Sequence, residues 1–182
     1  RFDGGLSYIL DLRTRSPTRE EVEGEIAADL LTTRLRVEGP VPGGAVLLGT
    51  RVIHGLGTPA LGRGDFPYGY RDLLVRGDWG DRGRVGGFLT GFWNGEEVRL
   101  DLGDLAFADG AQWGNLALAG GVSGALGEFS GDLRVAVSRY DASLPVADSL
   151  PLFARSRSDR VRITGDVSAP WGAGVLRVGA SM

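Results

Sequence analysis

Glycine is the residue that most limits what this chain can fold into. Thirty-one of the 182 residues are glycine, and they follow no collagen-like period of three. Most of them lie between short runs of Val, Leu, Ile, Phe and Thr, which favour strands. Glycine weakens the interior of a strand, but it permits tight turns, bulges and close approach of backbones. The pattern therefore predicts an all-β fold with many short connections.

Length, charge and cysteine content exclude several classes of protein. The length fits one domain, so we expect a single β-barrel domain over residues 1–182. The formal net charge of −3 argues against a nucleic-acid partner. The absence of cysteine excludes disulfides and thiolate metal sites. No apolar run approaches the roughly 20 residues of a membrane helix, and no leader pattern opens the chain. We therefore expect no membrane span and a cytoplasmic location, or secretion if a leader has been removed.

Alternation of apolar and polar residues predicts the strands. Residues 17–30 fit either a short helix that begins after Ser16-Pro17 or a strand, and both alternatives stay open. The clearest alternating segments are residues 5–13, 31–39, 131–140, 159–167 and 174–182. Residues 45–55 are expected to form a largely buried strand.

Two dipeptides predict hairpin turns. Asn94-Gly95 and Asp109-Gly110 both favour the type I′ turn, in which the two central residues take positive φ. The region 84–119 is therefore expected to be an antiparallel meander. Its continuation, "GGVSGALGEFSGD" at 120–132, is interpreted as a bend and a close contact between two strands. Together these features predict an antiparallel up-and-down β-barrel of about eight to nine strands, with a sandwich as the alternative.

Residues 56–72 are rich in Gly and Pro and are expected to form a long loop at the mouth of the barrel. His54 ends the strand before this loop, where a histidine could act as a general base. Asp65, Tyr68 and Tyr70 lie within the loop and could transfer protons or donate hydrogen bonds. These four residues are the candidate catalytic groups. In the alternative interpretation, His54 is a rim residue and the aromatic rings only fasten the loop.

Four further residues are candidates for contact with a substrate. Phe66 belongs to the same loop, and Arg51 precedes His54 in its strand. Trp93 and Trp113 lie next to the two expected hairpin turns, so they could line the mouth of a pocket. Cross-strand packing of these rings is the alternative. The chain contains no metal-binding histidine motif, phosphate loop or dinucleotide fingerprint, so neither a metal nor a cofactor is expected.

The stretch "FADGAQWGNLALAGGVSGALGEFSGDLRV" resembles the late hairpin of the allene oxide cyclase and dirigent barrels and of the bacterial spirotetronate-type cyclases. The resemblance covers about one sixth of the chain. It implies a barrel that needs no cofactor and whose lumen guides the cyclisation of an apolar, polyketide-like chain. The residues that carry it are Phe107, Asp109, Gly110, Gly120, Gly121, Ser123, Gly124 and a displaced Phe129.

The functional expectation is a barrel that binds a hydrophobic small molecule and cyclises or isomerises it without a cofactor. A lipocalin-like carrier without enzymatic activity and a secreted structural β-protein are the alternatives, and a homodimer stays open. An outer-membrane barrel is less favoured, because Arg and Asp recur on the polar faces of most strands. In addition, several apolar faces look too short for a lipid-facing band.

Overall fold

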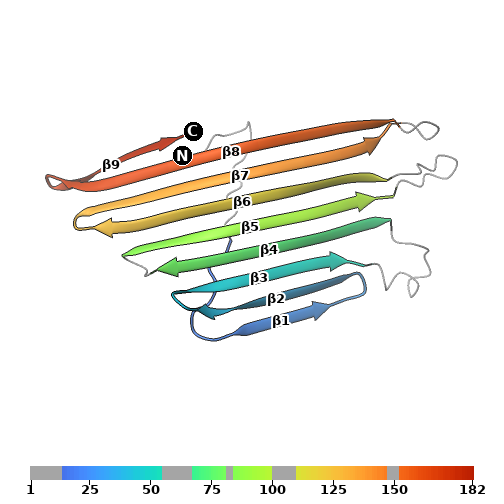
Figure 1. The fold of residues 1–182 in the computed structure, drawn as a ribbon, viewed down its shortest axis with the longest axis horizontal. Coiled ribbons are helices and arrows are strands. Elements are labelled where there is room, and N and C mark those ends of the chain that lie inside the picture. Colours follow the sequence, from blue (N-terminus) through green and yellow to red (C-terminus); the bar gives the residue numbers. More distant parts are fainter. Residues whose placement is uncertain (1–13, 55–66, 81–83, 100–109, 147–151) are drawn as a thin grey trace.

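The computed structural model describes residues 14–54, 67–80, 84–99, 110–146 and 152–182, which form one antiparallel sheet (Figure 1). Its nine strands lie side by side in chain order, each hydrogen-bonded to the next. This confirms the prediction of an all-β, antiparallel, up-and-down arrangement. The strands are β1 (Glu23–Ala28), β2 (Thr32–Val41), β3 (Gly44–Ile53), β4 (Tyr68–Gly80), β5 (Val85–Val98), β6 (Ala111–Leu126), β7 (Phe129–Pro145), β8 (Phe153–Trp171) and β9 (Gly174–Ser181).

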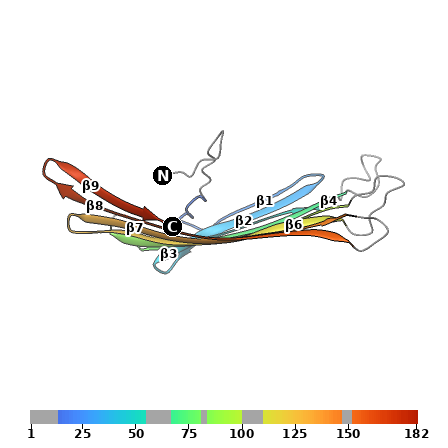
Figure 2. The same ribbon diagram turned by 90° about the horizontal axis from the view of Figure 1, so that it is seen from above.

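The described sheet does not close into a barrel. β1 and β9 are its two edges, and each is hydrogen-bonded to one neighbour only. Figure 2 shows a single twisted layer with no second sheet stacked on it in the described part of the chain. The predicted meander is thus present, whereas the predicted closure is not seen among the described residues.

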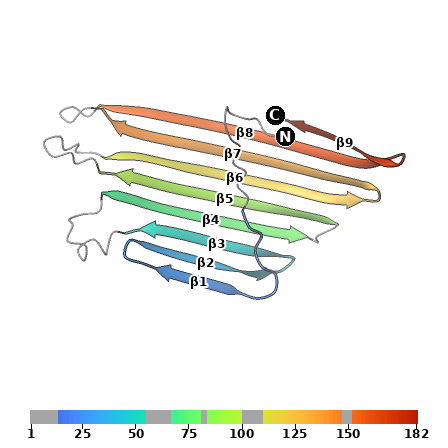
Figure 3. The same ribbon diagram turned by 180° about the vertical axis from the view of Figure 1, so that it is seen from behind.

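The two ends of the sheet differ in their connections (Figure 3). At one end, here called the turn end, neighbouring strands are joined by residues 42–43, 81–84, 127–128 and 172–173. At the other, here called the loop end, they are joined by residues 29–31, 54–67, 99–110 and 146–152. Gly43, Gly80, Gly127 and Gly172 take positive φ at the four turn-end connections. Glycine adopts this backbone conformation without the clash that a Cβ would cause.

The structure decides one open alternative and corrects two predictions. Residues 17–30 contain the strand β1 and no helix, which confirms the strand alternative. The expected loop at 56–72 ends earlier, because β4 begins at Tyr68. β5 continues straight through Asn94-Gly95 instead of turning there. The expected strand at 5–13 and the Asp109 half of the second expected turn lie outside the described residues. No helix in the described ranges is long and apolar enough to cross a membrane.

The glycine cluster at 120–132 forms the end of one hairpin. β6 runs through its first half, and the turn at Gly127 leads into β7. A Cβ added to Gly121 would lie 2.8 Å from Phe88 Cε1 and 3.1 Å from the carbonyl oxygen of Leu133. One added to Gly124 would lie 2.7 Å from the carbonyl oxygen of Arg84. The expected role of these glycines in close packing is therefore confirmed.

The sheet has almost no interior of its own. Only Ala45, Leu47 and Ala111 are buried hydrophobic residues among those described. A sheet normally buries one face against another layer of structure. The described residues supply no such layer, so most of the large apolar side chains remain exposed.

Candidate functional site

The pairing of the strands sorts the side chains onto two faces. Directly paired residues point to the same side of a sheet, and successive residues along a strand point to opposite sides. Leu118 pairs with Gly91 on β5 and with Val137 on β7. We call the side to which Leu118 points the apolar face. The side to which its neighbours Ala117 and Ala119 point is the polar face.

The apolar face carries a continuous band of exposed aliphatic side chains across all the long strands. Leu89, near the middle of β5, is 57% exposed. Glycines alternate with these side chains and are covered by them, as Leu118 Cδ2 lies 3.3 Å from where a Cβ of Gly91 would be. The aliphatic members of the band are Ile26, Leu35, Val37, Val41, Val46, Leu48, Val52, Leu73, Val75, Val85, Leu89, Leu116, Leu118, Val122, Leu126, Leu133, Val135, Val137, Val161, Val167, Leu176 and Val178.

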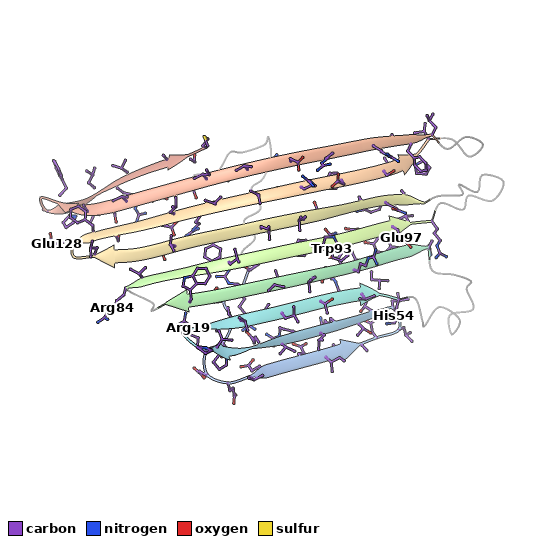
Figure 4. All side chains as sticks on the ribbon, in the orientation of Figure 1. Arg19, His54, Arg84, Trp93, Glu97 and Glu128 are labelled. Atoms are coloured by element: carbon purple, nitrogen blue, oxygen red, sulfur yellow. The ribbon has the colours of Figure 1, made fainter. Side chains whose placement is uncertain are left out.

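Aromatic side chains border this band at both ends. Trp79, Phe129 and Trp171 lie on the apolar face near the turn end, and all three are exposed. Trp93 borders the band toward the loop end (Figure 4), and Phe153 lies on the same face at the loop end of β8. Aromatic rings at two levels that enclose an aliphatic zone are typical of the two interfaces of a lipid bilayer.

The band crosses the strands obliquely. Trp79, at its turn-end border, lies in the same paired row as Gly165, six residues before Trp171 on β8. Six residues span about 20 Å and four strand spacings about 19 Å, so this border runs at roughly 45° to the paired rows. The other border, from Val52 on β3 to Val137 on β7, shifts by four residues over four strands, or roughly 35°.

The polar face carries eight arginines and eight carboxylates. The arginines are Arg34, Arg36, Arg51, Arg76, Arg134, Arg160, Arg162 and Arg177. The carboxylates are Glu23, Glu25, Glu38, Asp72, Asp78, Glu96, Asp132 and Asp166. Several form short pairs, such as Arg76 Nε with Asp78 Oδ1 at 2.7 Å and Arg134 Nε with Asp132 Oδ1 at 2.9 Å. This face is therefore suited to contact with water, unlike the face behind it.

Arg51, Tyr70 and Asp72 form one polar cluster on β3 and β4. The guanidinium carbon of Arg51 lies 4.6 Å from the ring centre of Tyr70, and Arg51 Nη2 lies 3.2 Å from Asp72 Oδ2. The Tyr70 hydroxyl donates to Asp72 Oδ2 at 2.8 Å. Burial, followed by this hydrogen bond, raises the pKa of Tyr70. Tyr70 is thus held neutral, as a hydrogen-bond donor.

A second cluster continues the first across β4, β5 and β6. Tyr68 donates to Glu96 Oε2 at 2.7 Å, and this hydrogen bond is the main cause that raises the pKa of Tyr68 to about 12. Asn94, which is buried, donates to Glu96 Oε1 at 2.8 Å. Asn115 donates to Asn94 Oδ1 through its backbone N–H at 3.0 Å and through its amide nitrogen at 2.9 Å. These bonds stabilise Asn94 within a strand, where its dipeptide with glycine would otherwise favour a turn.

Residues 14–22 cross the polar face and are anchored by Glu38. This carboxylate is 1% exposed, forms an ion pair with Arg15 and another with Arg36 at 2.9 Å, and accepts the Thr18 N–H at 3.1 Å. Burial alone would raise the pKa of Glu38, but the hydrogen bonds and positive charges around it hold that pKa below its ordinary value. Arg19 Nη1 adds a bond of 2.7 Å to the carbonyl oxygen of Gly80.

The structure brings some of the predicted site residues together and separates others. Arg51, Tyr68 and Tyr70 lie on neighbouring strands of the polar face, and Trp113 lies on that face opposite Glu96. Trp93 is on the other face, and β5 continues past it through Asn94-Gly95, so the prediction that Trp93 lies next to a hairpin turn is wrong.

His54 lies at the loop end, and its Nε2 is 3.1 Å from Thr33 Oγ1 (Figure 4). Its backbone N–H donates to the carbonyl oxygen of Leu31 at 2.9 Å. These contacts place His54 beside the loop end of β2. The remaining predicted residues, Asp65 and Phe66, lie outside the described residues.

Sequence reasoning missed Glu38, Glu96, Asn94 and the apolar band. Glu38 stands among alternating polar residues and looked like an ordinary exposed carboxylate. The strand alternation carried a signal for the band, since most of the large apolar residues of the long strands fall on one side. Their alignment across strands depends on register, which the sequence alone does not show.

The described residues contain no group of three or more His, Asp or Glu that could hold a metal ion. No family model matches the chain, and no significant match is found among curated proteins or among solved structures. Function is therefore inferred from the chain's own residues.

Proposed function

We propose that this chain forms part of the wall of a membrane-inserted β-barrel. Its apolar face would contact lipid acyl chains, and its polar face would line an aqueous interior. The observation that carries the proposal is the oblique aliphatic band with aromatic rings at both borders. On β6 the band runs from Leu116 to Leu126, about 33 Å along the strand, which a tilt of about 40° reduces to about 25 Å. Membrane barrels have a lipid-facing band of about this height and strands tilted by about 35–45°.

Two properties of the sheet make a bilayer a better environment than water for the apolar face. The exposed aliphatic side chains form a continuous surface over all the long strands, far more extensive than the scattered apolar residues of an ordinary soluble protein. The backbone hydrogen bonds are made between neighbouring strands, which is one of two arrangements that lipid tolerates. The edges β1 and β9 would then pair with strands other than those described, because an open edge is costly in lipid.

The two reasons that disfavoured an outer-membrane barrel at the level of sequence no longer apply. Arg and Asp do recur on the strands, but the arginines and carboxylates of the polar face point away from the band. The apolar faces looked short in the sequence because glycines and a turn predicted at Asn94-Gly95 interrupted them. In the structure β4 to β8 are 13 to 19 residues long, which is enough for a lipid-facing band. The unequal connections at the two ends also fit membrane barrels, which have short turns on one side and longer loops on the other.

The tryptophans provide a direct test. Trp79, Trp93 and Trp171 lie on the apolar face, and Trp113 lies on the polar face. The chain would be folded into phosphatidylcholine vesicles that contain lipids brominated on the acyl chain, which quench tryptophan fluorescence only on contact. We expect Trp113→Phe to leave the quenched intensity unchanged, because that ring faces the interior, and Trp93→Phe to reduce it. Quenching of Trp113 as strong as that of Trp93, or no quenching at all, would refute the proposal.

The cyclase and carrier functions expected from the sequence, and the cytoplasmic location, stay predictions that no contact among the described residues favours. A barrel with lipid on its outside could still bind an apolar molecule inside. The cluster of Arg51, Tyr68 and Tyr70 is the part of the polar face on which such binding would be sought first.

A further inference from the structure

A hollow of about 790 Å³ lies on the apolar face between the aliphatic band and the loop end. Gly95 and Gly114 form its floor, because they pair with each other and have no side chain to fill the space. Arg71, Arg155 and Arg157 line it. In the proposed orientation, the hollow lies at the level where the lipid headgroups join the acyl chains.

Two of these arginines are held against aromatic rings. The guanidinium carbon of Arg71 lies 5.5 Å from the ring centre of Trp93, and that of Arg155 lies 6.0 Å from the ring centre of Phe153. Among the described residues neither arginine forms an ion pair, whereas Arg157 lies 3.2 Å from Asp159 and 3.7 Å from Asp141. Both side chains are exposed. A stacked guanidinium keeps its N–H donors free and loses less rotamer freedom when it binds an oxyanion.

The charges in and around the hollow leave a positive excess. Arg71, Arg155 and Arg157 line it together with Glu97 and Asp141 (Figure 4 shows Glu97). Glu96 also lines it, but its carboxylate is bound by Tyr68 and Asn94 on the polar face. The neighbouring pair Arg139–Asp159, 2.7 Å apart, cancels. Three cations against two facing carboxylates give a net charge of +1, and the two cations without a carboxylate partner lie at opposite sides of the hollow.

We propose that this hollow binds the phosphate-bearing headgroups of anionic membrane lipids, with Arg71 and Arg155 each binding the phosphate of a lipid on its own side of the hollow. The inference rests on the proposed function, because only insertion brings headgroups to this level. Arginine suits the task because its planar guanidinium can donate two parallel hydrogen bonds to phosphate oxygens. The glycine floor leaves room for the polar part of the headgroup, and the aliphatic side chains next to Trp93 would contact the upper carbons of its acyl chains.

The test compares lipids within one bilayer. The chain is folded into phosphatidylcholine vesicles that contain increasing fractions of brominated phosphatidylglycerol, and the part of the quenching that is lost in Trp93→Phe is taken as the signal. The relative binding constant of phosphatidylglycerol over phosphatidylcholine follows from its dependence on the lipid fraction. A basic residue near an anionic surface contributes about five-fold, and Trp93 reports on the lipid beside Arg71. We therefore expect about a five-fold loss of preference in the double variant Arg71→Gln, Arg155→Gln. The matched control, Arg160→Gln on the polar face, should keep the preference.

The outcomes separate the two proposals. A chain that inserts normally but shows the same lipid preference in the double variant as in the unmodified protein overturns this inference alone. A chain that inserts into neither kind of vesicle overturns the proposed function and the lipid site with it. Loss of the preference in the double variant and in concentrated salt, with normal insertion into phosphatidylcholine, supports the lipid site.

Discussion

Leu89→Arg places a charge in the middle of the aliphatic band. On β5 the band runs from Val85 to Trp93, and Leu89 lies four residues, or about 13 Å along the strand, from each border. At the strand tilt given by the band, that distance is about 10 Å in depth. An arginine on the lipid face of a membrane barrel costs about 2–4 kcal/mol at the midplane and about 0–1 kcal/mol near the interfaces.

The expected result is therefore a depth-dependent loss of stability. Leu89→Arg should reduce the folding equilibrium constant in phosphatidylcholine vesicles by a factor of about 30 to 900, as measured by urea titration of the folded fraction. Val85→Arg, on the same strand and face but at the border, should reduce it by no more than about five-fold. Ala119→Arg, on the polar face between the uncharged residues Thr90 and Ala136, controls for the added side chain.

The reasoning fails if the two substitutions on β5 have the same effect. On a soluble protein with this face in water, both would change stability by about 0.5 kcal/mol or less. If the face were instead packed against protein, Leu89→Arg would destabilise in the absence of lipid as well. Only a bilayer makes the penalty depend both on lipid and on the distance of the substituted residue from the nearer border of the band.

Three further outcomes follow from contacts described above. Gly121→Val should reduce the yield of folded protein, because its Cβ would lie 2.8 Å from a neighbouring ring carbon. Gly131→Val should fold, because the atom nearest to its Cβ would be 3.6 Å away, and equal yields of the two variants would contradict this reasoning. Glu96→Gln should lower the pKa of Tyr68 from about 12 toward the ordinary value, as followed by ultraviolet titration; an unchanged titration would show that the carboxylate is not the cause. The pKa of Glu38 is lowered in the folded state, so its contribution to stability is present above the unfolded pKa and lost as the pH falls through the folded one. Glu38→Gln should therefore increase the rate of proteolysis of residues 14–22 at neutral pH and reduce the change in that rate between neutral and acidic pH. A rate equal to that of the unmodified chain at neutral pH would contradict this.

The sequence predicted the sheet well because alternation is a local property. The predicted segments 31–39 and 174–182 overlap almost completely with β2 and β9. Each of these strands lies beside the strand that precedes it in the chain, to which a short connection joins it. The turn predicted at Asn94-Gly95 was wrong, because turn preference is also a local property. The hydrogen bonds that Asn94 accepts from Asn115 come from a strand about twenty residues away along the chain. A distant partner that satisfies the side chain removes the reason for the turn.

The candidate site was harder to predict than the strands. Tyr68, Tyr70 and Arg51 were recognised from their chemistry, and the pairing of β3 with β4 does place them together. Trp93 and Trp113 could not be assigned to opposite faces once a turn had been placed between them. The aliphatic band was hidden for a related reason, because glycines such as Gly91 interrupt it along the chain and are covered only by side chains from the next strand.

The oblique course of the band also determines how any larger assembly must be built. A border that shifts by four to six residues over four strands corresponds to a stagger of about one to one and a half residues per strand. In a closed barrel of n strands, this stagger accumulates to a shear number between about n and 1.5n, which together with n determines the diameter. In the proposed barrel, strands that joined β1 to β9 would have to continue the same offset. The register of the nine described strands would then restrict the circumference of that barrel.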